Sequence, residues 1–198
     1  MRALEREFSQ VEAGTRTLFV TIQYSFSPPD YDREPAPSLY AEVSAKYWSS
    51  RRHSPVDLSF RPTDLNVAVI VRRGEIRHDP RLLQERWVPN EWYVVVMERI
   101  KALCRTKPVA FHVFADADEE SELKEIAPFP NARVHLWLRD SDQPYRAFHS
   151  MVLADVTICG MTGFCWAGGC LSAGTLKIIP PRNDIVYFPR HPLWLEAD

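Results

Sequence analysis

This sequence of 198 residues has few glycines, few cysteines and almost no net charge. Its 24 basic and 26 acidic residues leave a formal charge of −2, so no overall field favours nucleic acid or an anionic membrane surface. The four cysteines form no CxxC pair and have no histidine at metal-ligand spacing, which disfavours a zinc site or a disulfide framework. We expect them to be small buried side chains in a reducing compartment.

The glycines are concentrated in one uncharged stretch, Val156–Leu176, which holds five of the seven. Its length would suffice to span a bilayer. The glycines and the strand-like start at Asp155–Cys159 instead favour a buried strand, loop and helix, so no transmembrane segment is expected. The N-terminus is charged and lacks the apolar region of a signal peptide. The compartment therefore stays open, with the cytoplasm as the default expectation.

Several common catalytic and nucleotide-binding signatures are missing. No GxGxxG follows a predicted strand, and neither a P-loop, a GxSxG nor an HExxH occurs. The sequence therefore gives no motif-level support for dinucleotide binding, P-loop chemistry, a nucleophile elbow or a zinc protease.

From Val67 onward, segments typical of strands and helices alternate. Strands are predicted at Val67–Arg72, Val109–Ala115, Arg133–Leu138, Asp155–Cys159 and Leu176–Ile179. Helices are predicted at Glu91–Arg105, Asp118–Ala127, Tyr145–Leu153 and Phe164–Ala173. Such alternation predicts an α/β fold with a doubly wound, mostly parallel, Rossmann-like sheet, which we assign to residues 66–198.

Residues 1–65 are predicted to be a short N-terminal extension. Within it, Leu18–Tyr24 is typical of a strand, and Ser38–Ser49 has one apolar helical stripe with Ser38 as a candidate N-cap. At the other end of the chain, Trp194 is expected to pack against the body of the domain.

Polar or glycine-rich residues follow three of the predicted strands. Arg72 and Arg73 come directly after a β-branched run, and paired guanidiniums suit an anion with several oxygens. Asp116 follows the next strand, where a carboxylate can accept hydrogen bonds from a ribose or a base. Thr162 and Gly163 lie between a strand and a helix, where free N–H groups and the helix dipole favour an anion. Together the three strand ends suggest a nucleotide diphosphate.

Each strand end also has a purely structural interpretation. The two arginines can be ordinary solvated or ion-paired charges at the end of a strand. Asp116 or Asp118 can be the N-cap of the next helix, and for Asp118 this is the favoured interpretation. The turn at Thr162 can be a tight turn without a ligand.

These strand ends resemble the donor-binding half of the fucosyltransferase superfamily, which includes the α-1,2-, α-1,6-, nodulation and protein O-fucosyltransferases. The first family motif, H-x-R-R-x-D, corresponds to Ile70–Glu75. The second resembles F-S-D-D and corresponds to Phe114–Ala117, and the third, S-S-F-S-x-x-A, corresponds to Thr162–Ala167. The order and spacing of the three motifs agree, and the resemblance extends over roughly residues 36–181.

The resemblance implies a GT-B-type fold of two facing Rossmann-like domains, of which the second binds GDP-fucose. The implied activity is transfer of fucose from GDP-fucose to a glycan or protein acceptor, without a metal or other cofactor. Arg72 is the implied catalytic residue, since the family arginine contacts the β-phosphate and stabilises the departing diphosphate. The implied donor-binding residues are Arg72, Arg73, Glu75, Asp116, Thr162, Gly163 and Phe164.

The sequence departs from the family pattern in ways that leave alternatives open. Ile70 replaces the motif histidine, Glu75 replaces the aspartate, and the region before the sheet is short for an acceptor-binding domain. A catalytically decayed nucleotide-sugar- or glycan-binding module is therefore an alternative, and a flavodoxin-like domain with an unrelated partner is a third. Glu75, His78 and Asp79 are candidates for a general base by position alone.

Overall fold

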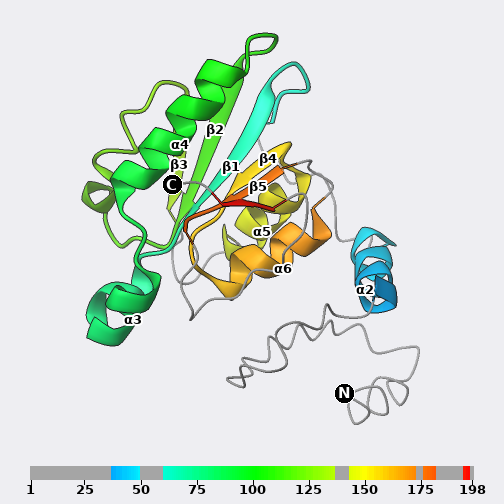
Figure 1. Ribbon diagram of the computed structural model, residues 1–198, viewed down its shortest axis with the longest axis horizontal. Coiled ribbons are helices and arrows are strands. Elements are labelled where there is room, and N and C mark those ends of the chain that lie inside the picture. The colour runs from blue at the N-terminus through cyan, green and yellow to red at the C-terminus, as the bar shows by residue number, and fades with distance from the viewer. Residues whose placement is uncertain (1–36, 50–59, 137–142, 173–175, 182–193, 197–198) are drawn as a thin grey trace.

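The computed structural model describes residues 37–49, 60–136, 143–172, 176–181 and 194–196. Within these ranges its centre is a six-stranded sheet in which every strand pair is parallel (Figure 1). In spatial order the strands are β3 (Ala132–Leu136), β2 (Val109–Ala115), β1 (Leu65–Val71), β4 (Val156–Ile158), β5 (Leu176–Ile179) and β6 (Trp194–Glu196). This is the strand order of dinucleotide-binding Rossmann folds. The predicted α/β class with a parallel, Rossmann-like sheet is confirmed.

Helices flank the sheet on both sides. They are α2 (Pro37–Ser49), the 3₁₀ helix η2 (Gly74–His78), α3 (Pro80–Arg86), α4 (Asn90–Leu103), the 3₁₀ helix η3 (Glu120–Leu123), α5 (Gln143–Leu153) and α6 (Gly163–Leu171). The chain winds outward from β1 in both directions, so right-handed crossovers put α4 on one face and α5 and α6 on the other. Figure 1 shows α4 on one side of the strands, away from α5 and α6.

Strand β1 is the central element of the sheet. It pairs with β2 along its full length and with β4 through Val67–Val69. Its residues Val67–Val71 are at most 1% exposed, as expected for a β-branched run covered on both faces. The winding direction reverses between β1 and β4. The carboxyl ends of these two strands therefore form the switch point where ligands of such sheets bind.

Most predicted elements are present, with small differences at their ends. The strands Val109–Ala115 and Leu176–Ile179 have the predicted bounds. Pro89, and not a capping side chain, occupies the N-cap position of α4, which begins at Asn90, one residue before the predicted start. Ser38 is likewise not an N-cap, because α2 already begins at Pro37.

Three local predictions were wrong. The acidic helix predicted at Asp118–Ala127 is reduced to η3, where Glu119 and Glu122 form a capping box. Helix α3 was not predicted, although Asp79 is a regular N-cap followed by Pro80 at the first position. The end of the chain adds strand β6 beside β5, where packing alone was expected.

Other predictions fall on parts of the chain that the structure does not describe. Residues 1–36, with the strand proposed at Leu18–Tyr24, lie outside the described residues, so the division at 65/66 stays a prediction. The uncharged stretch Val156–Leu176 contributes β4, α6 and the first residue of β5. Over the described ranges, no helix is both long and apolar enough to cross a bilayer.

A histidine is buried in the core where β2 meets β3. His112 is 0% exposed and lies between the rings of Phe60, at 4.6 Å, and His135, at 5.9 Å. Among the described residues neither of its ring nitrogens has a hydrogen-bond partner. Burial, with the nearby charges of His135 and Arg133, lowers the pKa of His112 to about 4. His112 is therefore neutral in the folded protein near pH 7.

We predict that His112 makes the fold acid-sensitive. Between the ordinary pKa of 6.5 and about 4, the unfolded chain binds a proton that the folded chain does not. The free energy of unfolding should therefore fall as pH drops through this window, by on the order of 3 kcal/mol at most. In urea denaturation from pH 7.5 to pH 4, His112→Leu should flatten this fall. His78→Gln, at an exposed position, should keep the parent slope, and an unchanged slope in His112→Leu would contradict the assignment.

Candidate functional site

The residues expected at the site come together at one edge of the sheet. Arg72 follows β1, Asp116 follows β2, and Thr162 follows β4 as the N-cap of α6. Because these strands are parallel, all three residues lie at the carboxyl edge, as predicted. That they line a common cleft stays a prediction.

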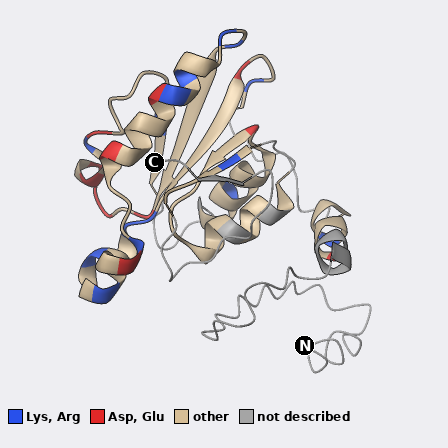
Figure 2. Ribbon diagram, in the orientation of Figure 1, with Lys and Arg blue, Asp and Glu red and all other residues tan. Residues whose placement is uncertain are grey.

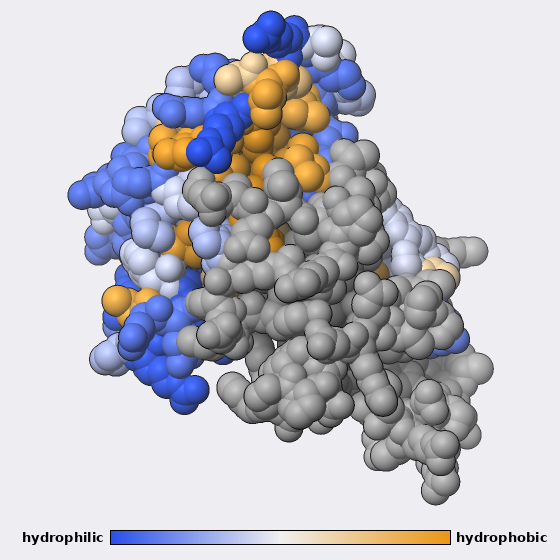
Figure 3. Space-filling model, viewed as in Figure 1, coloured by the Kyte–Doolittle hydropathy of each residue, from blue (hydrophilic) through white to orange (hydrophobic). Residues whose placement is uncertain are grey.

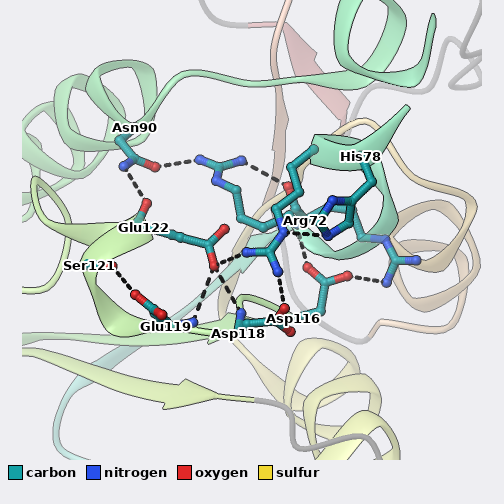
Figure 4. Close-up of polar contacts among 10 residues, drawn as sticks. Arg72, His78, Asn90, Asp116, Asp118, Glu119, Ser121 and Glu122 are labelled. Carbon is teal, nitrogen blue, oxygen red and sulfur yellow. Dashed lines mark hydrogen bonds and ion pairs between the residues drawn. The ribbon is translucent and has the colours of Figure 1, made fainter. Parts of the chain in front are cut away.

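Asp116 joins the ends of the two neighbouring strands β1 and β2. One of its carboxylate oxygens accepts a hydrogen bond from the backbone N–H of Arg73. The other lies 2.5 Å from Nη1 of Arg72 (Figure 4). The side chain is 11% exposed, and burial raises its pKa although the Arg73 N–H and the Arg72 charge oppose this. A Cβ at Gly74 would lie 2.6 Å from Oδ2 of Asp116, so glycine is needed for this approach. Asp116 therefore links the end of β2 to the end of β1 and is not a helix cap.

Arg72 is held between a partly buried and an exposed carboxylate. Its Nη2 donates to both oxygens of Glu75 at 2.5 Å, while Nη1 reaches Asp116. The Arg72 side chain is 29% exposed and that of Glu75 is 59% exposed. Partial burial opposes ionisation of Glu75, but the hydrogen bond and charge of Arg72 and the charge of Arg86 bring its pKa below the ordinary value. Glu75 is therefore a carboxylate at neutral pH, and the Arg72 guanidinium is within reach of solvent.

Arg73 points into the protein, unlike its neighbour. It is 0% exposed, and its guanidinium carbon lies 4.0 Å from the centre of the Trp87 ring. The guanidinium donates to the carbonyls of Arg72 and Val88, at 2.9 and 3.1 Å, and to the side-chain oxygen of Asn90. Burial lowers the pKa of Arg73, and neighbouring carboxylates oppose that shift. The structure thus argues against Arg73 as a donor-binding residue and gives it a structural role.

A second polar network extends from Arg73 away from the switch point. The Asn90 amide donates to the carbonyl of Glu122 at 2.8 Å and to the carboxylate of Glu125 at 2.7 Å. Arg77 pairs with Asp118 and Glu122, two residues that are labelled in Figure 4. Asp118 is therefore an ion-pair partner and not the predicted N-cap. Sequence reasoning missed this network, because an asparagine at the start of a helix is typical of a cap.

The charges are unevenly distributed around the sheet. Figure 2 shows acidic and basic residues interspersed over α3, α4 and the segment around η3. Helix α6, by contrast, contains no charged residue. Figure 3 shows apolar surface near the upper ends of β1 and β2, away from α3. Charged groups that could receive an anion thus lie on the β1 side of the switch point, and on the β4 side only uncharged donors are available from α6.

The β4 side of the switch point is built from main-chain groups. The Thr162 side chain accepts a hydrogen bond from the N–H of Cys165 at 3.1 Å and is buried. Gly163 begins α6, and Phe164 packs edge-on against Phe148 with ring centres 5.3 Å apart. The first N–H groups of a helix have no acceptor within it, and here the N–H of Cys165 is satisfied by the Thr162 side chain. Thr162 acts as an N-cap, and its assignment as a ligand stays a prediction.

Ile70 stands at the position of the family's motif histidine. Its side chain is 1% exposed, so it packs in the core. Its carbonyl accepts hydrogen bonds from the Gly160 N–H at 3.1 Å and the Tyr93 hydroxyl at 3.2 Å. A Cβ at Gly160 would lie 3.1 Å from the carbonyl oxygen of Ile70, so the ends of β1 and β4 approach closely. The apolar residue at this position thus completes the packing between β1, β4 and α4.

No protein-family model and no curated protein matches the sequence of this chain.

We predict that the two adjacent arginines differ in their contribution to stability. Arg73→Met leaves the buried acceptors of Val88 and Asn90 without their donor, so it should lower the free energy of unfolding by about 3 kcal/mol. Arg72→Met breaks partly exposed ion pairs and should cost about 1 kcal/mol. Chemical denaturation of both variants measures the difference. Equal losses, or a larger loss for Arg72→Met, would contradict the burial of Arg73.

Proposed function

We propose that the carboxyl edge between β1 and β4 binds the diphosphate of a nucleotide sugar, and that the chain is a glycosyltransferase of the fucosyltransferase type. The observation that carries the proposal is Arg72, a partly exposed guanidinium at the end of the central strand, beside the switch point of a Rossmann-like sheet. Ligands of open α/β sheets bind at such points. A guanidinium there can form two hydrogen bonds with phosphate oxygens.

The arrangement of the motif residues supports a donor site of this kind. Arg72, Asp116 and the start of α6 are far apart in the sequence and meet at one edge. In this proposal Arg72 binds the β-phosphate of GDP-fucose, with Asp116 fixing its orientation. The N–H group of Gly163 and the dipole of α6 add favourable charge for the same diphosphate.

In the proposed reaction, an acceptor hydroxyl replaces GDP at the sugar carbon. The bond between fucose and the β-phosphate breaks as the new glycosidic bond forms, with inversion at the sugar carbon, and GDP leaves. Arg72 then stabilises the negative charge that grows on the leaving diphosphate, which is the role of preorganised charge in catalysis. No metal is needed in this scheme. The acceptor, a glycan or a protein, would bind to a facing domain of GT-B type.

The observed contacts of the three positional candidates do not identify a general base. Asp79 accepts the N–H groups of Arg81 and Leu82 as the cap of α3. His78 contacts Arg77 at 2.9 Å, and Glu75 is bound to Arg72. Each is engaged in local structure in this conformation, so the proposal names no general base, and the proton of the acceptor hydroxyl passes to solvent.

A binding module that has lost catalysis is the second candidate. The specific observation in its favour is Ile70, which places a buried apolar side chain where the family has a histidine. A diphosphate site without that polar group can still bind GDP through Arg72. The two candidates thus share the binding site and differ in turnover.

We predict that GDP stabilises the protein and that Arg72 carries this effect. Lysine cannot reproduce the guanidinium fork, so Arg72→Lys should weaken GDP binding by roughly tenfold, about 1.4 kcal/mol. Thermal shift and calorimetric titration with GDP and UDP measure the affinities. Arg81→Lys is the matched control, since Arg81 is an exposed arginine of α3 paired with Glu85, and it should bind GDP like the parent. GDP binding by Arg72→Ala at parental affinity would refute the site.

Incubation with GDP-fucose separates the candidates. Release of fucose and GDP, absent in Arg72→Ala, supports the glycosyltransferase. GDP binding without release supports the module. No response to any nucleotide would reject both, and would leave a flavodoxin-like domain with an unrelated partner.

A further inference from the structure

Arg72, the residue proposed to bind the phosphate, already pairs with a carboxylate of its own chain. Both oxygens of Glu75 lie 2.5 Å from Nη2 of Arg72, so this carboxylate occupies one terminal nitrogen of the guanidinium. Asp116 pairs with the other terminal nitrogen of Arg72, Nη1. Of the two carboxylates, Glu75 is the exposed one, with 59% of its side chain accessible against 11% for Asp116. An incoming anion can therefore displace Glu75 far more easily than Asp116.

The local charge also matters to an incoming diphosphate. Arg72 carries one positive charge, and the two carboxylates that contact it carry two negative charges. Arg86, whose charge acts on Glu75, adds a second positive charge. The net charge of these four side chains is then about zero. A diphosphate approaching a neutral group gains little attraction while Glu75 stays in place. When Glu75 leaves Arg72, the terminal nitrogen that it releases faces the phosphate without a competing carboxylate.

We propose that Glu75 is an internal competitor of the diphosphate: it occupies Arg72 in the ligand-free protein and must leave when the nucleotide binds. The inference rests on the proposed function, since it concerns the same guanidinium. Glu75 thus opposes donor binding, whereas the family resemblance implied a donor-binding role. Its exposed position and short sequence distance from Arg72 allow the side chain to rotate away. Asp116 stays and keeps Arg72 oriented.

Competition predicts that removal of the Glu75 charge tightens binding. An exposed ion pair of this kind is weak, so Glu75→Gln should bind GDP roughly three- to tenfold more tightly than the parent. The same gain is expected with inorganic pyrophosphate, which lacks the base and the sugar. Calorimetric titration of both ligands at low ionic strength measures it, and added salt should reduce the gain.

Two controls separate the effect of Arg72 from the effect of net charge. Glu91→Gln removes one exposed carboxylate in the first turn of α4, so it alters net charge equally and should leave both affinities unchanged. In the background of Arg72→Ala, Glu75→Gln should give no gain, because the pair is then already broken. This double-mutant cycle separates competition at Arg72 from general attraction.

The outcomes distinguish the inference from the proposed function. A gain in Glu75→Gln that disappears without Arg72 supports the competitor. Parental GDP binding that depends on Arg72 but does not tighten in Glu75→Gln overturns the competitor and leaves the proposed function standing. Weaker binding in Glu75→Gln also overturns it and would make Glu75 a ligand. Absence of GDP and pyrophosphate binding in both the parent and Glu75→Gln overturns the two together.

Discussion

The partly buried carboxylate of Asp116 is the constraint on which the edge of the sheet depends. It receives the backbone N–H of Arg73 and the guanidinium of Arg72, so it fixes both the path of the chain after β1 and the position of one charged side chain. Burial raises its pKa, and the hydrogen bond from the Arg73 N–H and the charge of Arg72 oppose this shift. The close approach that it needs explains the glycine that follows the arginines.

Of the two adjacent arginines, Arg73 has a structural role and Arg72 has the proposed binding role. Neighbouring residues on an extended chain point in opposite directions, so only one of them can face the switch point. Arg73 turns inward beneath Trp87 and ties the strand end to Asn90 at the start of α4. Arg72 turns outward, where it meets Glu75. The pair thus anchors the strand end and leaves one guanidinium available at the surface.

The parallel sheet and the edge at which the site residues meet could be predicted from the sequence. The β-branched run Val67–Val71 and the alternation after it predict a central buried strand and parallel pairing. What could not be predicted was the direction of each side chain, because an arginine pair looks the same whether it is exposed or buried. The ion pairs of Arg72 and the network of Asn90 depend on contacts between segments far apart in the chain. Strand β6 was missed because three residues carry too little pattern.

The most direct test of the account is the position of bound GDP on the protein in solution. In ¹H–¹⁵N correlation spectra recorded during a GDP titration, the account predicts that the largest shifts occur at the Arg72 side-chain Nε–H and at the amides of Gly160, Thr162 and Gly163. These groups belong to the ends of β1 and β4. Shifts concentrated elsewhere, for instance at Lys101 and Phe129 beside α4, or no shifts at saturating GDP, would contradict a diphosphate site at this edge.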